Sequence, residues 1–220
     1  MYTQIQCLGV QKHITMPILK TDVNLPSAGN LNRPQKTKLA FILDNVLSED
    51  ECKALIDETE EKGYEQALLN VGFGRQVLDT NVRNNQRCII DSKDKAEWLW
   101  DKIKDYIPGT WNSYPVIGPN ERLRFLKYGP GEYFMPHMDG TYMRPDGSEK
   151  SYITIQLYLN EGFEGGNTTF LSNKDETQDV GVVPKPGRIL VFQHDILHEG
   201  SPLIKGTKYT MRTDIMYKIK

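Results

Sequence analysis

The segment Glu121–Gly140, ERLRFLKYGPGEYFMPHMDG, decides both the fold and the candidate site. An apolar, strand-like run is followed by a Gly-Pro-Gly turn and then by the pair His137 and Asp139. Residues two apart in an extended chain project from the same face, so these two side chains can converge on one point. Two histidines and one carboxylate with open positions suit a non-haem Fe(II). The missing ligand should be a distant histidine, and His198 is the candidate.

Length and composition set the limits around this segment. A chain of 220 residues is long enough for one domain with a short extension. Its 25% charged and 38% hydrophobic residues are typical of a globular protein and not of a disordered one. The net charge of −2 and the pI near 6.1 provide no electrostatic footprint for non-specific nucleic-acid binding.

The cysteines and the N-terminus bear on the compartment. Cys7, Cys52 and Cys88 are odd in number and widely spaced, which fits reduced thiols better than disulfides or a zinc site. The first 16 residues lack a basic region followed by an apolar run, and no run of about 18 apolar residues occurs. Neither secretion nor membrane insertion is predicted, and a cytoplasmic location is expected.

The N-terminal part of the chain has a linker-like composition. Residues 1–38 end in a stretch rich in Pro, Asn, Gly and Ser, which predicts an arm or linker. A single domain is expected over residues 39–220, beginning with a strand at Leu39–Leu43. Its jelly-roll core is expected over about 121–220.

Two helices are predicted before that core. Ser48 and Glu51 have the spacing of a capping box and begin the first helix. Asp91 or Ser92 can cap the second, whose apolar residues recur at helical spacing until Pro108. Both helices are interpreted as scaffold that packs against a sheet.

The region between the helices, residues 64–90, is predicted to be a loop. Its polar run at 79–87 is typical of a solvated loop held by Asn and Asp turns. The alternative is a substrate contact, because Arg83, Asn84 and Arg87 offer donors for an anion or a carbonyl group.

From residue 122 onward, short apolar runs alternate with Gly and Pro turns. The expected strands are 122–128, 152–159, 167–171, 179–183, 188–193 and 209–217. Many short strands of this kind favour a sandwich or a jelly roll, with the helices bracing one outer face. A small jelly roll has an open mouth, where a metal site with free positions would lie.

A rival metal site must be weighed against the one centred on His137. His194 and His198 are four apart, and on a helix they would resemble a zinc peptidase pair. We disfavour this because that motif has Glu where this chain has Asp195, and because nearby Pro and Gly residues leave little room for a helix. At a strand end, His198 instead completes the ligand set of His137 and Asp139.

An ordered series of motifs covers the second half of the chain. In chain order they are Tyr128-Gly-x-Gly with Tyr133, His137-x-Asp139, Leu157-Tyr-Leu-Asn160, Gly165-Gly-Asn-Thr-Thr-Phe170, Pro186-Gly, His198-Glu-Gly-Ser-Pro202 and Gly206-Thr-Lys208-Tyr209. With these motifs, residues 121–220 resemble the catalytic core of the Fe(II)- and 2-oxoglutarate-dependent dioxygenases, in their prolyl 4-hydroxylase-like branch. The resemblance implies an α+β, mainly β fold with a double-stranded β-helix, a cupin-like jelly roll.

The same resemblance implies cofactors and roles. Iron would be held by His137, Asp139 and His198, and 2-oxoglutarate would chelate it through its keto acid end. Lys208 would pair with the distal carboxylate of 2-oxoglutarate. O2 would be the oxidant and ascorbate the reductant, and an unactivated C–H bond would be hydroxylated with release of succinate and CO2.

Two cations and two tyrosines are candidates for contact with the co-substrate. Arg212 lies four residues beyond Lys208, so both cations face the same side of a strand. A guanidinium matches a carboxylate bidentately, which makes Arg212 a second candidate for the distal carboxylate. Tyr128 and Tyr158 match family positions that touch the co-substrate, and core packing is the alternative for each.

The fold does not specify the primary substrate, because one fold serves many substrates. Prolyl hydroxylation of a protein is one hypothesis, and hydroxylation of a small polar metabolite or another non-protein molecule is the alternative. A zinc-type hydrolase and a non-catalytic jelly-roll binding module are weaker competitors. The loop at residues 141–150 is a candidate lid over the mouth.

Overall fold

A large antiparallel sheet and a smaller one form the centre of the molecule. The computed structural model describes residues 16–26, 38–70, 75–172 and 175–220. The helices are α1 (Glu49–Lys62) and α2 (Lys93–Ile103). The strands are β1 (Leu19–Asp22), β2 (Ala40–Asp44), β3 (Glu65–Gln66), β4 (Leu69–Asn70), β5 (Gln76–Val77), β6 (Gln86–Asp91), β7 (Thr110–Trp111), β8 (Tyr114–Pro119), β9 (Arg122–Tyr128), β10 (Phe134–His137), β11 (Glu149–Tyr158), β12 (Glu164–Gly165), β13 (Thr168–Phe170), β14 (Val180–Val182), β15 (Ile189–Gln193), β16 (His198–Gly200), β17 (Leu203–Lys205) and β18 (Lys208–Lys218).

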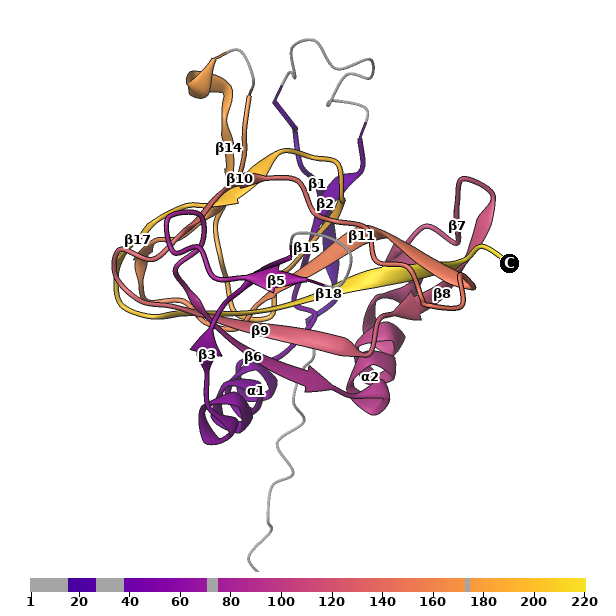
Figure 1. Ribbon diagram of the computed structural model, residues 1–220, viewed down its shortest axis with the longest axis horizontal. Helices are drawn as coiled ribbons and strands as arrows, with labels where there is room; N and C mark the ends of the chain where they lie inside the picture. Colours follow the sequence, from indigo (N-terminus) through magenta and orange to yellow (C-terminus); the bar gives the residue numbers. More distant parts are fainter. Residues whose placement is uncertain (1–15, 27–37, 71–74, 173–174) are drawn as a thin grey trace, which may run out of the picture.

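The order of the strands defines the architecture. The large sheet runs β1-β2-β15-β11-β18-β9-β6-β3, with β7 and β8 added beside β18, and the smaller sheet runs β10-β16-β13-β14. Figure 1 shows α1 and α2 on one side of the large sheet, under β6 and β9, while β10 and β14 lie on its other side. The predicted mainly β jelly roll with bracing helices is confirmed.

The alternation of side chains along the strands separates core from site. On β9, Leu123 and Phe125 are buried against the helix layer, in one cluster with Leu99 and Ile103 of α2. Burying each such side chain contributes about 1.5–3 kcal/mol. The intervening residues of β9, such as Arg124, face the space between the two sheets, where the site lies.

The helix boundaries follow from their caps. The Ser48 hydroxyl accepts from the backbone N–H of Glu51, and the Glu51 carboxylate accepts from the N–H of Ser48, as the predicted capping box requires. Ser92 caps α2. A single 3-10 turn, Lys104–Tyr106, follows α2, so the helix is shorter than its apolar pattern suggests. Within the described part of the chain, neither helix is long and apolar enough to cross a membrane.

Several segments differ from the sequence-based expectation, among them β10 and β16, which were not predicted as strands. Leu19–Asp22 lies in the predicted arm yet forms β1, which pairs with β2 at the edge of the large sheet. The rest of residues 1–38 lies outside the described residues apart from 16–18, 23–26 and 38. Within the predicted loop at 64–90, Gln86–Asp91 forms β6, which pairs with β9 along its whole length. The polar run before it concealed its alternating pattern, and β7 with β8 was missed because Gly and Pro interrupt that segment.

Candidate metal centre and active site

Strand pairing brings the two histidines together. His137 is the last residue of β10 and His198 the first of β16, and the antiparallel register places them opposite each other. Their ring centroids lie 4.4 Å apart. Asp139 follows two residues after His137, and ligand atoms of all three residues lie within 4.8 Å of one another. Among the described residues, this group can hold a metal ion.

Backbone carbonyls orient both imidazole rings. Nδ1 of His137 lies 2.7 Å from the carbonyl of Met135, and Nδ1 of His198 lies 2.9 Å from that of Ile196. Because a carbonyl only accepts, each Nδ1 carries the proton and each Nε2 presents a lone pair. The two Nε2 atoms lie 3.8 and 4.0 Å from Oδ1 of Asp139.

Burial keeps these imidazoles neutral. It lowers the pKa of His137 to about 3, with the neighbouring His198 as a further cause. Burial also lowers the pKa of His198. Neutral imidazoles are the form that binds metals, so both rings are ready to act as ligands near neutral pH.

Asp139 is held from three sides. Its other oxygen, Oδ2, accepts from the Thr154 hydroxyl, and its N–H donates to the carbonyl of His194 at 2.9 Å. Oδ1 lies 3.0 Å from Nη2 of Arg212. Burial alone would raise the pKa of this carboxyl, but the opposing effect of its charged neighbours, with Arg212 foremost, holds the pKa at about 2. An ionised carboxylate and two neutral imidazoles form a donor set that fits Fe(II).

Lys208 lies in the same pocket, at the start of β18. It is buried, its Nζ donates to the carbonyl of Gly166 at 2.7 Å, and Nζ lies 4.2 Å from the ring centroid of Tyr128. No described carboxylate forms an ion pair with it. Burial lowers the pKa of Lys208 to about 7. An anion entering the pocket would restore its charged form.

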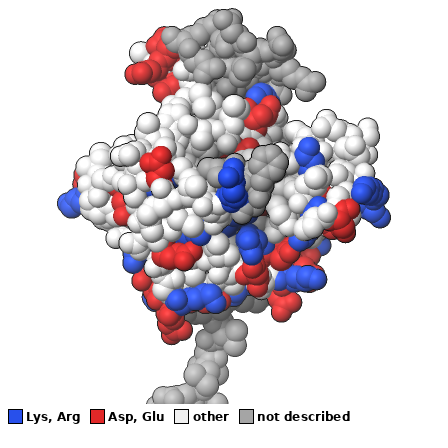
Figure 2. Space-filling view, viewed as in Figure 1, with Lys and Arg blue, Asp and Glu red and all other residues white. Residues whose placement is uncertain are grey.

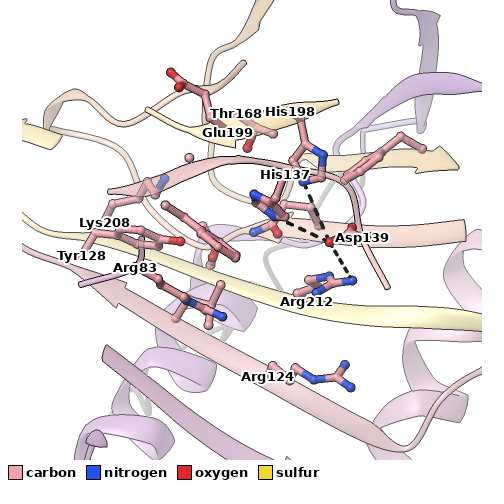
Figure 3. A pocket seen from close by; sticks show the side chains of 16 residues that line it. Arg83, Arg124, Tyr128, His137, Asp139, Thr168, His198, Glu199, Lys208 and Arg212 are labelled. Carbon is pink, nitrogen blue, oxygen red and sulfur yellow. Dashed lines mark ion pairs between the residues drawn. The ribbon is translucent and has the colours of Figure 1, made fainter. Parts of the chain in front are cut away.

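Arg212 lines the pocket too, but in a different environment. Its Nη2 contacts both Oδ1 of Asp139, at 3.0 Å, and Oδ1 of Asp214, at 3.2 Å. Figure 3 shows Arg212 beside Asp139, whereas Lys208 lies next to Tyr128 at the other end of the pocket. The two predicted cations therefore lie on the same face of β18, but only Arg212 contacts a metal ligand.

The two predicted tyrosines have separate environments. Tyr128 lines the pocket under Lys208. Tyr158 is fully buried among apolar side chains that include Phe170 and Phe192, and its hydroxyl donates to Thr168 at 2.8 Å. Tyr158 thus supports Thr168, which lines the pocket, and does not line it itself.

The three residues considered for substrate contact lie in three different environments. Arg83 lines the pocket, and its guanidinium carbon lies 4.5 Å from the ring centroid of Phe134. Asn84 fixes the backbone of the β10 connection, since its Oδ1 accepts from the N–H of Tyr133 at 2.7 Å. Arg87 lines a larger neighbouring groove and is paired with Glu65 at 3.0 Å.

Several residues of the site were missed from the sequence. Arg124 and Gln156 line the pocket, while Thr154 and Asp214 contact its charged residues. A signal was present for Arg124, since it alternates with buried apolar residues on a strand that leads to the His-x-Asp pair. The positions of Thr154 and Asp214 depend on which strands pair, and the local pattern does not determine this.

The rival histidine pair does not form. Residues 194–197 make a turn between β15 and β16, so His194 and His198 do not lie one helical turn apart. Nε2 of His194 lies 3.6 Å from Oδ1 of Asp214, and His194 is not a member of the candidate ligand group. The zinc peptidase arrangement is therefore wrong for this chain.

Comparison with known proteins agrees with this geometry. The family model for the 2OG-Fe(II) oxygenase superfamily matches residues 123–213. Two Arabidopsis thaliana proteins, probable prolyl 4-hydroxylase 8 and probable prolyl 4-hydroxylase 3, are 26% and 25% identical over 78% of this chain. A PKHD-type hydroxylase of Idiomarina loihiensis is 23% identical over 77% of it. The chain spans 66%, 67% and 73% of the lengths of these relatives.

Solved structures show the same fold. A prolyl hydroxylase from Trichoplax adhaerens, in complex with a hypoxia inducible factor peptide fragment, has a TM-score of 0.64 at 19% identity, covering 81% of this chain and 84% of the other. A collagen prolyl hydroxylase of Paramecium Bursaria Chlorella virus-1 has a TM-score of 0.58 at 19% identity, covering 84% and 98%. A Pseudomonas putida prolyl-4-hydroxylase has a TM-score of 0.58 at 18% identity, covering 81% and 92%.

Fold, motifs and relatives agree on one family. Residues 123–213 match the 2OG-Fe(II) oxygenase superfamily, and the chain is similar to relatives named as probable prolyl 4-hydroxylases and to structural neighbours named as prolyl hydroxylases. The predicted resemblance to this family is confirmed. Fe(II), 2-oxoglutarate and O2 are the cofactor and co-substrates that this family implies.

Proposed function

We propose that this protein hydroxylates an unactivated C–H bond with Fe(II), 2-oxoglutarate and O2. The observation that carries the proposal is the convergence of His137, Asp139 and His198 in one pocket with the unpaired cation Lys208. The balanced reaction takes one substrate C–H, one O2 and one 2-oxoglutarate to one C–OH, one succinate and one CO2. Iron bound by the three ligands would supply oxygen activation, which side chains alone do not provide.

The protein's own residues would bind and orient the reactants. Thr154 and Arg212 hold the Asp139 carboxylate in place, so this ligand would keep its orientation when a metal binds. Aromatic walls at Phe134 and Phe192 would limit access of water to the pocket.

We assign the distal carboxylate of 2-oxoglutarate to Lys208 and not to Arg212. Lys208 is buried without a described anionic partner, so a carboxylate would supply the missing charge. Arg212 already contacts two carboxylates, those of Asp139 and Asp214. Its proposed role is to position Asp139. Tyr128 is then the proposed neighbour of the bound co-substrate, because it lines the pocket under Lys208.

The proposed primary substrate is a prolyl residue of a peptide. This is supported by the relatives and neighbours named as prolyl hydroxylases, one of them in complex with a peptide. A groove beside the pocket, lined by residues that include Asn70, Gln76 and Tyr142, would accept the flanking residues. Ascorbate would serve as the reductant, and the buried free thiols of Cys52 and Cys88 are compatible with a cytoplasmic location.

The test is succinate formation by the purified protein with Fe(II), ascorbate, O2 and a panel of proline-containing peptides. Turnover should be lost on chelation and in His198→Ala. His194→Ala is the matched control and should retain more activity, because His194 is outside the ligand group. If 2-oxoglutarate failed to bind the metal-loaded protein, the proposal would be wrong.

A further inference from the structure

The pocket contains more positive charge than the proposed cofactors need. Arg83, Arg124, Lys208 and Arg212 line it, whereas Asp139 and Glu199 are its only acidic lining residues within the described part of the chain. Glu199 accepts a hydrogen bond from the Ser201 hydroxyl at 2.8 Å. Figure 3 shows its carboxylate turned away from Asp139.

When each charge is assigned to a partner, the pocket has more arginines than carboxylates that could pair with them. In the proposed holoenzyme, Lys208 pairs with the distal carboxylate, and Asp139 and the keto acid carboxylate together balance Fe(II). Asp214 is then shared by Arg124 and Arg212, each at 3.2 Å. Arg83 forms no ion pair with any described residue; its Nε donates to Oδ1 of Asn85 at 2.7 Å. Nε of Arg212 is buried with no acceptor in the described structure.

A buried arginine without an anionic partner destabilises the folded protein. Burial lowers the pKa of both Arg83 and Arg124, which means that their surroundings disfavour the charged form. An arginine nevertheless stays charged in proteins. A charge taken from water without a partner destabilises the protein, so a site of this kind is expected to receive an anion.

The unbalanced arginines lie where a substrate would enter. Arg83 and Arg124 line both the metal pocket and the larger groove beside it. Arg83 lies over the ring of Phe134, and that ring stacks on His137 with centroids 3.7 Å apart. The other arginines of the groove are paired, Arg122 with Asp91 at 2.8 Å and Arg87 with Glu65 at 3.0 Å. Among the described arginines of the groove, Arg83 alone has no carboxylate partner, and Arg124 shares the carboxylate of Asp214 with Arg212.

We propose that the primary substrate carries a carboxylate close to the carbon that is hydroxylated, and that Arg83 and Arg124 bind this carboxylate. The guanidinium fork suits a planar carboxylate. The inference rests on the proposed hydroxylation and adds a chemical feature, a carboxylate near the reacting carbon, that the primary substrate must have. The carboxylate belongs either to an acidic residue next to a proline in a peptide or to the free α-carboxylate of an amino acid.

Ligand binding in the absence of turnover tests this directly. The full-length protein is loaded with Mn(II) in place of Fe(II) and saturated with 2-oxoglutarate, and the broadening of ligand proton NMR signals by Mn(II) reports binding near the metal. Two matched pairs are titrated: Ala-Pro-Asp against Ala-Pro-Asn, both with blocked ends, and L-proline against L-prolinamide. In at least one pair the acid should bind about tenfold or more tightly than the amide, the effect of a charge-assisted hydrogen bond.

Variants locate the effect. No described carboxylate pairs with Arg83, so Arg83→Gln leaves no carboxylate without its partner. This variant should reduce the preference for the acid to about twofold or less, and Arg124→Gln should have the same effect. Lys127→Gln is the matched control, because Lys127 is on β9 like Arg124 but forms an ion pair with Glu60 of α1. Circular dichroism melts establish that each variant is folded.

Each outcome has one meaning. A preference in the peptide pair identifies an acidic peptide as the source of the carboxylate, and a preference in the proline pair identifies a free amino acid. Equal binding of acid and amide, no binding in either pair, or a preference that survives both arginine substitutions would overturn the inference. Failure of 2-oxoglutarate itself to bind would instead overturn the proposed function.

Discussion

Asp139 combines two interactions that a metal ligand needs, a hydroxyl donor on one oxygen and a guanidinium on the other. The donors are Thr154 and Arg212, and the carboxylate is almost completely buried between them, with 3% of its side chain exposed. Because Arg212 also contacts Asp214, it keeps a carboxylate partner if Asp139 is removed.

Asp139→Ala should therefore abolish metal-dependent turnover and leave the fold intact. The same result is expected for His137→Ala, whose ring contributes little to the apolar core. Succinate formation and a circular dichroism melt in the absence of metal are the two measurements. A variant that is inactive because it unfolds would show that these side chains have a structural role.

Lys208 should make the affinity for 2-oxoglutarate depend on pH. Burial lowers its pKa to about 7 in the free protein, and a bound carboxylate would raise that pKa. Below this pH, Lys208 is already charged and its contribution to affinity is constant. Above it, binding requires proton uptake, so the dissociation constant should rise by up to about tenfold per pH unit until the pKa of the bound form is reached. Calorimetry on the Mn(II)-loaded protein measures this.

A matched variant isolates that effect. Lys208→Arg retains the positive charge, and its guanidinium does not titrate in this range. Its affinity for 2-oxoglutarate should be independent of Lys208 titration between about pH 6 and 9. A dissociation constant of the unmodified protein that is also flat above pH 7 would contradict the assignment of Lys208 to the distal carboxylate.

At the scale of the elements, the turn before β15 fixes the connection between β2 and α1. Gly187 accepts hydrogen bonds from the N–H groups of Val46 and Leu47 and donates to the carbonyl of Tyr158. It has φ +71, and a Cβ at this position would lie 2.0 Å from the carbonyl oxygen of Leu47. A residue other than glycine would require the two segments to separate.

Gly187→Ala should lower the free energy of unfolding by about 2 kcal/mol or more, through backbone strain and the clash with Leu47. Urea denaturation measures the change. Gly109→Ala is the control, because a Cβ there meets nothing within 4 Å and its effect should stay within about 1 kcal/mol. Equal effects of the two substitutions would show that the contact with Leu47 does not constrain the fold.

At the scale of the whole molecule, the site joins the two sheets. His137 and His198 belong to the small sheet, whereas Lys208 and Arg212 belong to the large one. A metal with 2-oxoglutarate would contact both sheets and would bind only the folded chain. Ligand binding should therefore appear as thermal stability.

Mn(II) and 2-oxoglutarate at about 100 times their dissociation constants should each raise the free energy of unfolding by about 2.7 kcal/mol, which for a chain of this size corresponds to about 5–10 °C in Tm. Differential scanning fluorimetry measures the shift. Asp139→Ala should lose it. An unchanged Tm at ligand concentrations that saturate the protein would exclude coupling between the site and the fold.

Much of the fold was predictable from local signals. Some features depend on only a few neighbouring residues, because helix caps, strand pleats and turns are formed by short-range interactions. Examples are the capping box at Ser48, the alternation along β9 and the Gly-Pro-Gly turn. The resemblance added the cofactors and the double-stranded β-helix to a ligand set and a jelly roll that the residue pattern already indicated. The β6 strand and the edge strand β1 were missed, since polar residues predominate beside β6 and all four residues of β1 are exposed. A strand of this kind is defined by its neighbours.

The sequence by itself determined the His-x-Asp pair, the cap residues and the two cations on one face of β18, because each follows from the geometry of a single segment. Only the tertiary structure showed that Lys208 and Arg212 have different neighbours and that His194 does not pair with His198. It also placed Arg83 and Arg124 where the pocket and the groove meet. These outcomes depend on the registers of β10 with β16 and of β9 with β18. Both registers join segments more than 50 residues apart, and no local pattern specifies them.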